Sequence, residues 1–138
     1  MLPEDWIPHR RDDGELLGWI RPEHPHRPEA DAWVAIDVLG RPASAAVDWL
    51  DAEAALEAVG LAWLADVWML EGEAAEPLRV RFVEVTPPTD EPGRIVVKVD
   101  DFGDMQRPPA DQLTLPWPAP RRLRPAVAGD SDGRTLAR

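Results

Sequence analysis

The chain has 138 residues, of which 44% are hydrophobic and 30% are charged, values that are typical of one globular domain with a single core. The net charge of −11 argues against binding to nucleic acid or to an anionic membrane, because both require a basic surface. The absence of cysteine excludes disulfides, thiolate chemistry and cysteine-based metal sites, and no apolar run is long enough to predict a transmembrane helix.

Charge is distributed unevenly along the chain. Residues 1–104 carry nine Arg or Lys against 23 Asp or Glu, whereas residues 105–138 carry six Arg against three Asp. The sequence therefore predicts an acidic body, whose charge serves solubility or suits a cationic partner or polyanion mimicry. The basic tail is expected to fold back on this body, to pair with a second copy, to be disordered or to meet an external partner. Its clustered arginines are Arg121, Arg122 and Arg124.

The choice of residues also indicates where the protein comes from and where it acts. One lysine stands against fourteen arginines, and asparagine is absent, a bias that GC-rich codons produce in bacterial genomes. The first residues lack the basic and apolar regions of a signal peptide. We therefore expect a cytoplasmic bacterial protein.

The first part of the chain predicts an arm and two strands. Residues 1–13 contain two prolines and a polar run, which predict an irregular N-terminal arm. Residues 15–21 and 32–38 predict strands, the second because of its β-branched residues. Within the first strand, Gly18 indicates a bulge or a close approach of another backbone.

The clearest predicted element is a helix from Asp48 to Val59. Asp48 is a good N-cap, and Asp51 places an acid in the first turn, where the helix dipole favours it. Gly60 is suited to the C-terminal end of the helix. Leu50 points away from the apolar stripe and must find a tertiary contact or stay exposed. The stripe itself recurs at helical spacing and consists of Trp49, Ala52, Leu56 and Val59.

Three further strands are predicted downstream. Residues 61–70 predict a strand that is covered on both sides, because residues of both parities are apolar. Residues 78–85 predict a strand whose alternation slips at Phe82 and Val83, which indicates a β-bulge. Residues 94–100 predict the last strand. Its inward-facing residues are expected to be Ile95, Val97 and Val99.

Together these elements predict an α+β fold. About five or six mostly antiparallel strands would form a strongly curved sheet or a small open barrel, covered by the helix at about 48–59. The single domain would span residues 14–104, between the irregular arm at 1–13 and a Pro- and Arg-rich extended tail at 105–138.

Tryptophan dominates the aromatic residues, with seven Trp, two Phe and no Tyr. Such side chains are expected to fill the core, because each buries a large apolar surface. The alternative is that some of them line a pocket or an interface. The candidates for that role are Trp19, Trp33, Trp63 and Trp68.

Few polar residues are candidates for catalysis or metal binding. Asp100, Asp101 and Asp104 form an acidic cluster that has the groups to bind a hard cation or to act in acid–base catalysis, although a solvated strand end is the favoured interpretation. His24 and His26 lie in a proline-broken loop without the rigid ligand set of a zinc site. No phosphate-binding loop or nucleophile elbow is present. We therefore predict no metal and no cofactor.

These observations favour a non-enzymatic interaction or regulatory protein that binds a cationic protein surface. The alternative is a small-molecule binding module with a Trp-lined hydrophobic pocket in the curved sheet, and a third hypothesis is an enzyme that uses the acidic cluster. The expected partners are a basic protein or a second copy bound through the tail.

Overall fold

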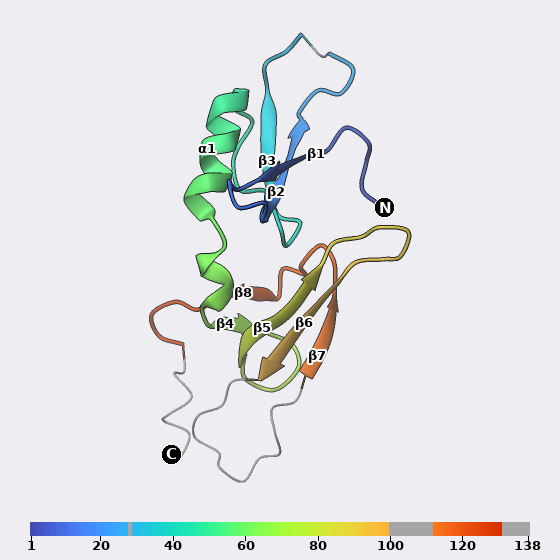
Figure 1. Cartoon of the computed structure of the whole chain (residues 1–138). Coiled ribbons are helices and arrows are strands. Elements are labelled where there is room, and N and C mark those ends of the chain that lie inside the picture. Colours follow the sequence, from blue (N-terminus) through green and yellow to red (C-terminus); the bar gives the residue numbers. More distant parts are fainter. Residues whose placement is uncertain (28, 100–111, 131–138) are drawn as a thin grey trace.

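The computed structural model describes residues 1–27, 29–99 and 112–130, except for the side chains of Ala62 and Trp63. The described residues form two antiparallel sheets and one α-helix (Figure 1). The first sheet has the order β1-β2-β3, and the second has the order β7-β6-β5-β4-β8. This arrangement confirms the predicted α+β class with antiparallel strands and one covering helix, although the strands divide into two sheets.

The elements have the following bounds. The first sheet contains β1 (Ile7–Arg10), β2 (Leu16–Pro22) and β3 (Trp33–Asp37). The helical elements are α1 (Trp49–Val59) and the 3-10 helix η1 (Ala62–Ala65). The second sheet contains β4 (Trp68–Leu70), β5 (Leu78–Thr86), β6 (Arg94–Val99), β7 (Gln112–Pro116) and β8 (Leu123–Pro125).

Helix α1 begins and ends where the sequence predicts. The side chain of Asp48 accepts a hydrogen bond of 2.8 Å from the backbone N–H of Asp51, which satisfies one of the donors that a helix start leaves open. Gly60 has φ 56°, a conformation that costs glycine little, and its N–H donates to the Leu56 carbonyl at 2.9 Å. Leu50 stays exposed, with 74% of its surface accessible.

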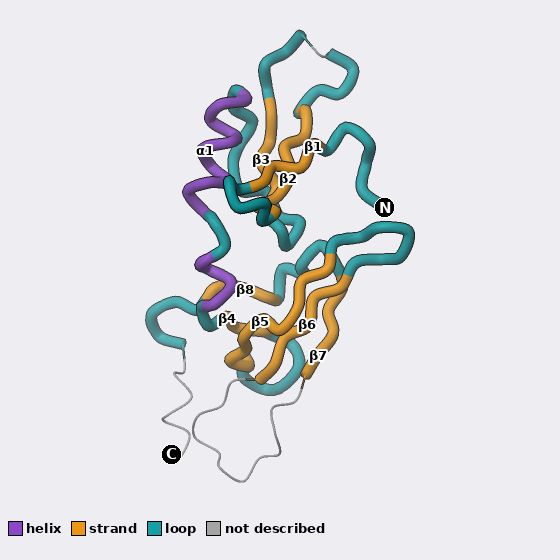
Figure 2. Tube along the Cα trace, in the orientation of Figure 1, coloured by secondary structure: helices purple, strands orange, loops and turns teal. Residues whose placement is uncertain are grey.

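One face of the first sheet packs against α1 (Figure 2). The buried residues on this side come from β2, β3 and α1, and they are Leu17, Ile20, Ala35, Ala52 and Leu56. The register between β1 and β2 shifts at His9, so that Leu17 is an extra residue, and such a bulge changes which side chains share a face. A Cβ on Gly18 would lie 2.0 Å from the Ile36 carbonyl oxygen. The predicted close approach at Gly18 is therefore confirmed.

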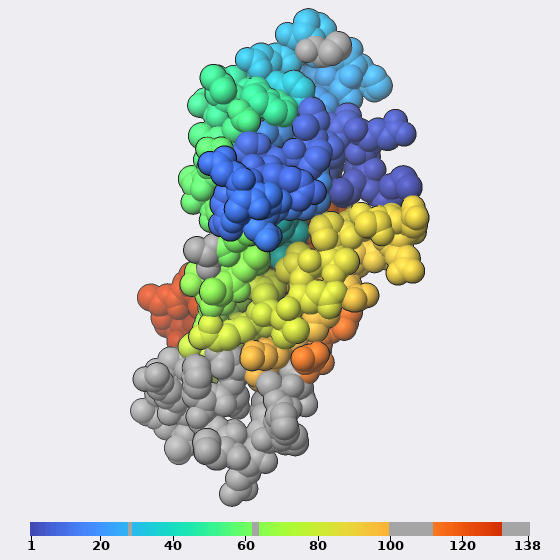
Figure 3. Space-filling model, in the orientation of Figure 1, coloured from blue at the N-terminus to red at the C-terminus, as the bar shows by residue number. Residues whose placement is uncertain are grey.

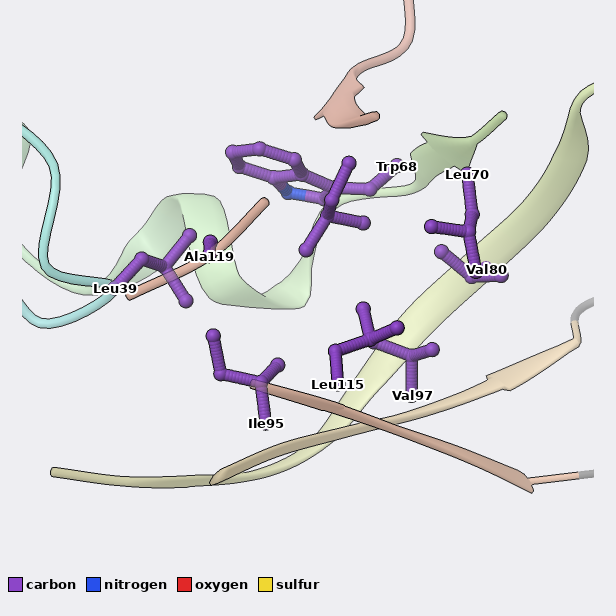
Figure 4. Close-up of a cluster of buried hydrophobic side chains, with 9 residues drawn as sticks. Leu39, Trp68, Leu70, Val80, Ile95, Val97, Leu115 and Ala119 are labelled. Carbon is purple, nitrogen blue, oxygen red and sulfur yellow. The ribbon is translucent and has the colours of Figure 1, made fainter. Parts of the chain in front are cut away.

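The second sheet encloses the larger core, part of which Figure 4 shows. The register between β5 and β6 runs from Phe82 opposite Val97 to Glu84 opposite Val96, so Val83 is the extra residue of the predicted bulge. Ile95 is fully buried, as expected for the inward face of β6. The buried residues of this core are Leu39, Trp68, Leu70, Val80, Ile95, Val97, Leu115, Ala119 and Leu123.

The segment at 61–70 differs from the predicted continuous strand. Its first part forms the 3-10 helix η1, and the Leu64 N–H donates to the Leu61 carbonyl at 3.0 Å. Only β4 pairs as a strand, between β5 and β8, and all of its residues are buried. A short apolar run is compatible with helix or strand, and here the turn that follows Gly60 continues as helix.

The chain ends also differ from their predicted forms. The arm at 1–13 is not wholly irregular, because Ile7–Arg10 pairs with β2 as an edge strand, a position that tolerates Pro8. Within the predicted extended tail at 105–138, the described residues 112–130 contain two strands, of which β7 pairs with β6 and β8 pairs with β4. Leu115 and Leu123 of this segment are buried in the second core, and the segment therefore completes the fold that was assigned to residues 14–104.

The two sheets are joined through the segment between β7 and β8. The Trp117 indole N–H donates to the Val38 carbonyl at 2.9 Å, and the Ala119 N–H donates to the Leu39 carbonyl at 2.8 Å. The guanidinium of Arg41 donates to three further carbonyls, two in this segment and one at the start of β8. These acceptors are Ala119, Pro120 and Leu123.

Within the described residues, no helix combines the length and the apolar character that are needed to cross a membrane.

Candidate functional site

The three candidate tryptophans whose side chains the structure describes, Trp19, Trp33 and Trp68, do not gather around one pocket. Trp19 is buried on the face of the first sheet opposite α1, where its ring lies 6.1 Å from that of Trp6 and 5.7 Å from that of Trp117. Trp33 is half-buried and packs edge-to-face on Trp49, with a centroid distance of 5.0 Å. These pairs have the tilted and T-shaped geometries that aromatic packing favours. These tryptophans therefore pack against other side chains of the fold.

The remaining candidates divide between the second core and the residues that the structure leaves out. Trp68 is 7% exposed and packs edge-to-face on Phe82, with a centroid distance of 5.2 Å. The predicted acidic cluster falls outside the described residues, as does the Trp63 side chain. The members of that cluster are Asp100, Asp101 and Asp104.

Trp68 also lines a groove between the two sheets, with a volume of about 480 Å³. Its walls come from the end of α1, the residues that lead into β4, and the residues at the end of β8. Five of the lining residues are apolar and two are carboxylates, so the groove presents two negative charges on an apolar surface. The lining residues are Asp37, Val59, Asp66, Val67, Trp68, Pro125 and Ala126.

Asp37 is held rigidly in this groove. Its Oδ1 accepts hydrogen bonds from the backbone N–H groups of Leu39 and Arg41, at 2.9 and 3.1 Å. Burial raises the pKa of Asp37, and the backbone N–H groups of residues 39–41 and the charge of Arg41 oppose that shift. The carboxylate is therefore partly desolvated, a state that a cation placed nearby would relieve.

Asp66 differs from Asp37 because it is exposed. It follows η1 directly, and it makes neither a hydrogen bond nor an ion pair with any described residue. A carboxylate of this kind remains available to a ligand or a partner.

An acidic surface runs from α1 toward the groove. Residues 42–78 contain eight Asp or Glu and no Lys or Arg. In Figure 3 this segment, in green, runs down the left side of the visible face. We call the carboxylates of α1 and its cap the α1 acidic face. It consists of Asp48, Asp51, Glu53 and Glu57.

Within the described residues, no arginine or lysine pairs with the α1 acidic face. The imidazole of His9 on β1 contacts it, with Nδ1 3.5 Å from Glu53 Oε2 and Nε2 3.3 Å from Glu57 Oε1. Asp51 is exposed at the first turn. The negative charge of this helix is therefore only partly matched within the molecule.

The tail arginines, in contrast, pair with acids around the second sheet. Arg122 contacts Glu73 at 2.7 Å, and Arg124 contacts Glu71 at 2.7 Å. Arg124 also binds Asp130 at 2.9 Å, and this bond, with the Val127 N–H, lowers the pKa of Asp130 to about 2. The folding-back of Arg122 and Arg124 onto the acidic body is therefore confirmed.

The described residues contain no group of three or more His, Asp or Glu that converges to hold a metal ion. His24 and His26 are exposed in the loop between β2 and β3.

Sequence reasoning missed Asp37 and Asp66 as candidate residues. Asp37 lies at the end of a strand and Asp66 follows a short helix, and only the fold brings them to the same groove. A usable signal was nevertheless present, because the absence of Lys and Arg from residues 42–78 marks the acidic segment to which Asp66 belongs.

Comparisons of the chain with protein-family models, with curated proteins and with solved structures found no match. The assignment of a function therefore rests on geometry and charge.

Proposed function

We propose that this protein is a non-enzymatic interaction protein that binds a cationic surface of a partner protein through the α1 acidic face. The observation that carries the proposal is the segment at 48–66, which has five acids and no Lys or Arg. Around the second sheet, arginines neutralise acids such as Glu71 and Glu73. On α1 the carboxylates stay without such partners in the described structure and are available to an external cation.

Electrostatics explains why this arrangement suits binding. Complementary charge raises the rate of encounter and selects the partner, while each exposed ion pair adds little to the affinity by itself. A contact of this type weakens as salt rises, because exposed charges are screened over about 8 Å at physiological ionic strength. Acidity that served only solubility would instead act through the net charge, wherever the acids lie.

Charge-matched variants test the proposal. D51N/E57Q removes two charges from the α1 acidic face, and D90N/E91Q removes two exposed charges from the loop between β5 and β6. Tagged proteins would be used to capture partners from lysate of the source organism at low and moderate salt, with quantitative mass spectrometry as the readout. We expect a basic protein that wild type and D90N/E91Q retain and that D51N/E57Q loses.

Two results would remove the proposal. The first is equal capture by both variants, since position would then not matter. The second is the absence of any salt-sensitive partner of the wild-type protein.

A second candidate function is a small-molecule binding module. The groove volume of about 480 Å³ falls in the range of natural ligand sites, and its lining is largely apolar. Of the predicted pocket residues, Trp68 lines the groove, whereas Trp19 and Trp33 pack elsewhere. A thermal-shift screen of uncharged metabolites tests this function, which requires a compound whose stabilising effect disappears in a Val67→Asp variant.

A further inference from the structure

The composition of the groove restricts what it can hold. A purely apolar ligand would desolvate Asp37 and Asp66 without compensation, which is costly for charged groups. An anion would be repelled by both carboxylates. A ligand with an apolar stem and a cationic head satisfies the apolar walls and the carboxylates together.

Three arginines lie near the groove in the part of the chain that the structure describes, and each donates to another group. The guanidinium of Arg81 donates to the Ala65 carbonyl at 2.6 Å, next to Asp66. Arg41 lies close enough to influence Asp37, but its guanidinium N–H groups donate to carbonyls between β7 and β8 and at the start of β8. Arg124 binds Glu71 and Asp130. Within the described residues, neither groove carboxylate takes part in an ion pair.

The wall chemistry favours arginine over lysine as the cationic head. A guanidinium is planar and weakly hydrated, and it stacks on aromatic surfaces while its donors bind carboxylates. The groove offers the exposed ring of Pro125 and the small exposed part of Trp68, 7% of its surface, beside two carboxylates. A lysine ammonium is a compact and strongly hydrated charge, and it gains less from such walls.

The position of the groove favours a side chain of a protein over a free small molecule. Val59, the last residue of α1, forms part of its lining, so the groove lies at the end of the α1 acidic face. A cationic surface that lies along α1 would therefore bring its side chains to the groove.

We propose that this groove receives one arginine side chain of the cationic partner, with its guanidinium against Pro125 and the exposed part of Trp68 and with Asp37 and Asp66 as acceptors. This inference rests on the proposed function and adds to it the residue that the partner must supply. Asp66 supplies an exposed carboxylate at the groove, and Asp37 supplies a fixed one that its backbone hydrogen bonds already orient.

The test uses the full chain and N-acetyl-arginine amide as the probe. Binding would be followed by ¹⁵N–¹H NMR, with the Trp68 indole signal and the Val67 and Ala126 amide signals as reporters. The control ligand is N-acetyl-citrulline amide, which has nearly the same shape without the charge. We expect saturable shifts of these signals with the arginine probe and none with the citrulline probe.

Three variants sharpen the test. D66N should weaken binding of the arginine probe about fivefold, as expected for an exposed charge. D37N keeps an Oδ1 acceptor for the Leu39 and Arg41 N–H groups, and it should weaken binding about tenfold because the lost charge is partly buried. D90N, at an exposed acid far along the chain, should have no effect.

Equal shifts with citrulline, or arginine shifts that D66N and D37N leave unchanged, would overturn the inference. Its failure is distinguishable from failure of the proposed function. If the arginine probe does not bind but D51N/E57Q still loses the partner, only the groove assignment is wrong. If D51N/E57Q retains the partner, the proposed function fails whatever the groove binds.

Discussion

Helix α1 and the second sheet differ in how their acidic residues are matched. Around the second sheet, several acids lie in ion pairs with arginines of β6 and of the residues in and just before β8. On α1, which covers the first sheet, the acids face His9 or solvent. The arginine pairs of the second sheet are Arg94–Glu84, Arg122–Glu73, Arg124–Glu71 and Arg124–Asp130.

This difference in the pairing of acids indicates where a cationic partner would bind, which the net charge alone does not. Exposed ion pairs contribute little stability each, so the arginines of the second sheet mainly cancel charge locally. The α1 acidic face keeps its charge and projects it to solvent. A cation that approaches α1 therefore meets carboxylates that no described arginine or lysine pairs with.

The sheets also differ in the sequence separation of their paired strands. The first sheet pairs consecutive strands, whereas the second pairs β4 with β8 from the tail. The largest predicted effect tests whether the tail stabilises the second sheet. Leu123 comes from the tail and is fully buried in the second core. Leu123→Ala should reduce the free energy of unfolding by about 2–5 kcal/mol, because it leaves a cavity. Val127→Ala, at a side chain that is 64% exposed, should change it by less than about 0.5 kcal/mol. Urea denaturation measures both, and equal small effects would show that the tail is dispensable.

The junction between the sheets supplies the next prediction. Arg41→Met removes the guanidinium that donates to the carbonyls of Ala119, Pro120 and Leu123, and it should cost about 3 kcal/mol because buried acceptors lose their donor. Arg121→Met is the matched control, since Arg121 is exposed and makes no hydrogen bond or ion pair with described residues. Denaturation curves that shift equally for the two variants would contradict the assigned role of Arg41.

A smaller effect concerns the pH dependence of stability. The pKa of Asp130, beside the second sheet, is lowered in the folded protein, whereas the pKa of Asp37, in the first sheet, is raised. The Arg124 contact lowers the pKa of Asp130 to about 2, so its stabilising contribution is present above the unfolded value of about 3.9 and disappears as pH falls toward 2. Burial raises the pKa of Asp37, so protonation of Asp37 below its folded pKa favours the folded state.

NMR titration of the carboxyl carbons measures both pKa values directly. D130N should remove the part of the stability loss that occurs between about pH 4 and pH 2. A stability curve of D130N that falls as steeply as that of wild type in this window would disprove the Asp130 assignment.

The sequence predicted the elements whose signals are local. Asp48 and Gly60 mark the ends of α1 through capping chemistry, and the slipped alternation at Val83 marks a bulge. It did not predict that residues 112–125 return to pair with β6 and β4, because edge pairing over long separations leaves no local pattern. The 3-10 helix at Ala62–Ala65 was missed because short apolar runs suit either structure.

The candidate site was less predictable than the fold for the same reason. Its acidic segment is visible in the sequence, since residues 42–78 lack Lys and Arg. The groove, however, combines Asp37, Val59, Asp66 and Pro125, and no spacing rule links these positions. Such a site becomes visible only when the two sheets are placed together.

The most direct test of the central claim is the association rate of the captured basic partner, measured by stopped flow at low and high salt. At low salt, D51N/E57Q should associate about tenfold more slowly than wild type, because the α1 acidic face steers the encounter. D90N/E91Q should associate at the wild-type rate, and all three rates should converge at high salt. Equal slowing of the two variants at low salt would contradict the account, because the net charge and not the α1 acidic face would then govern binding.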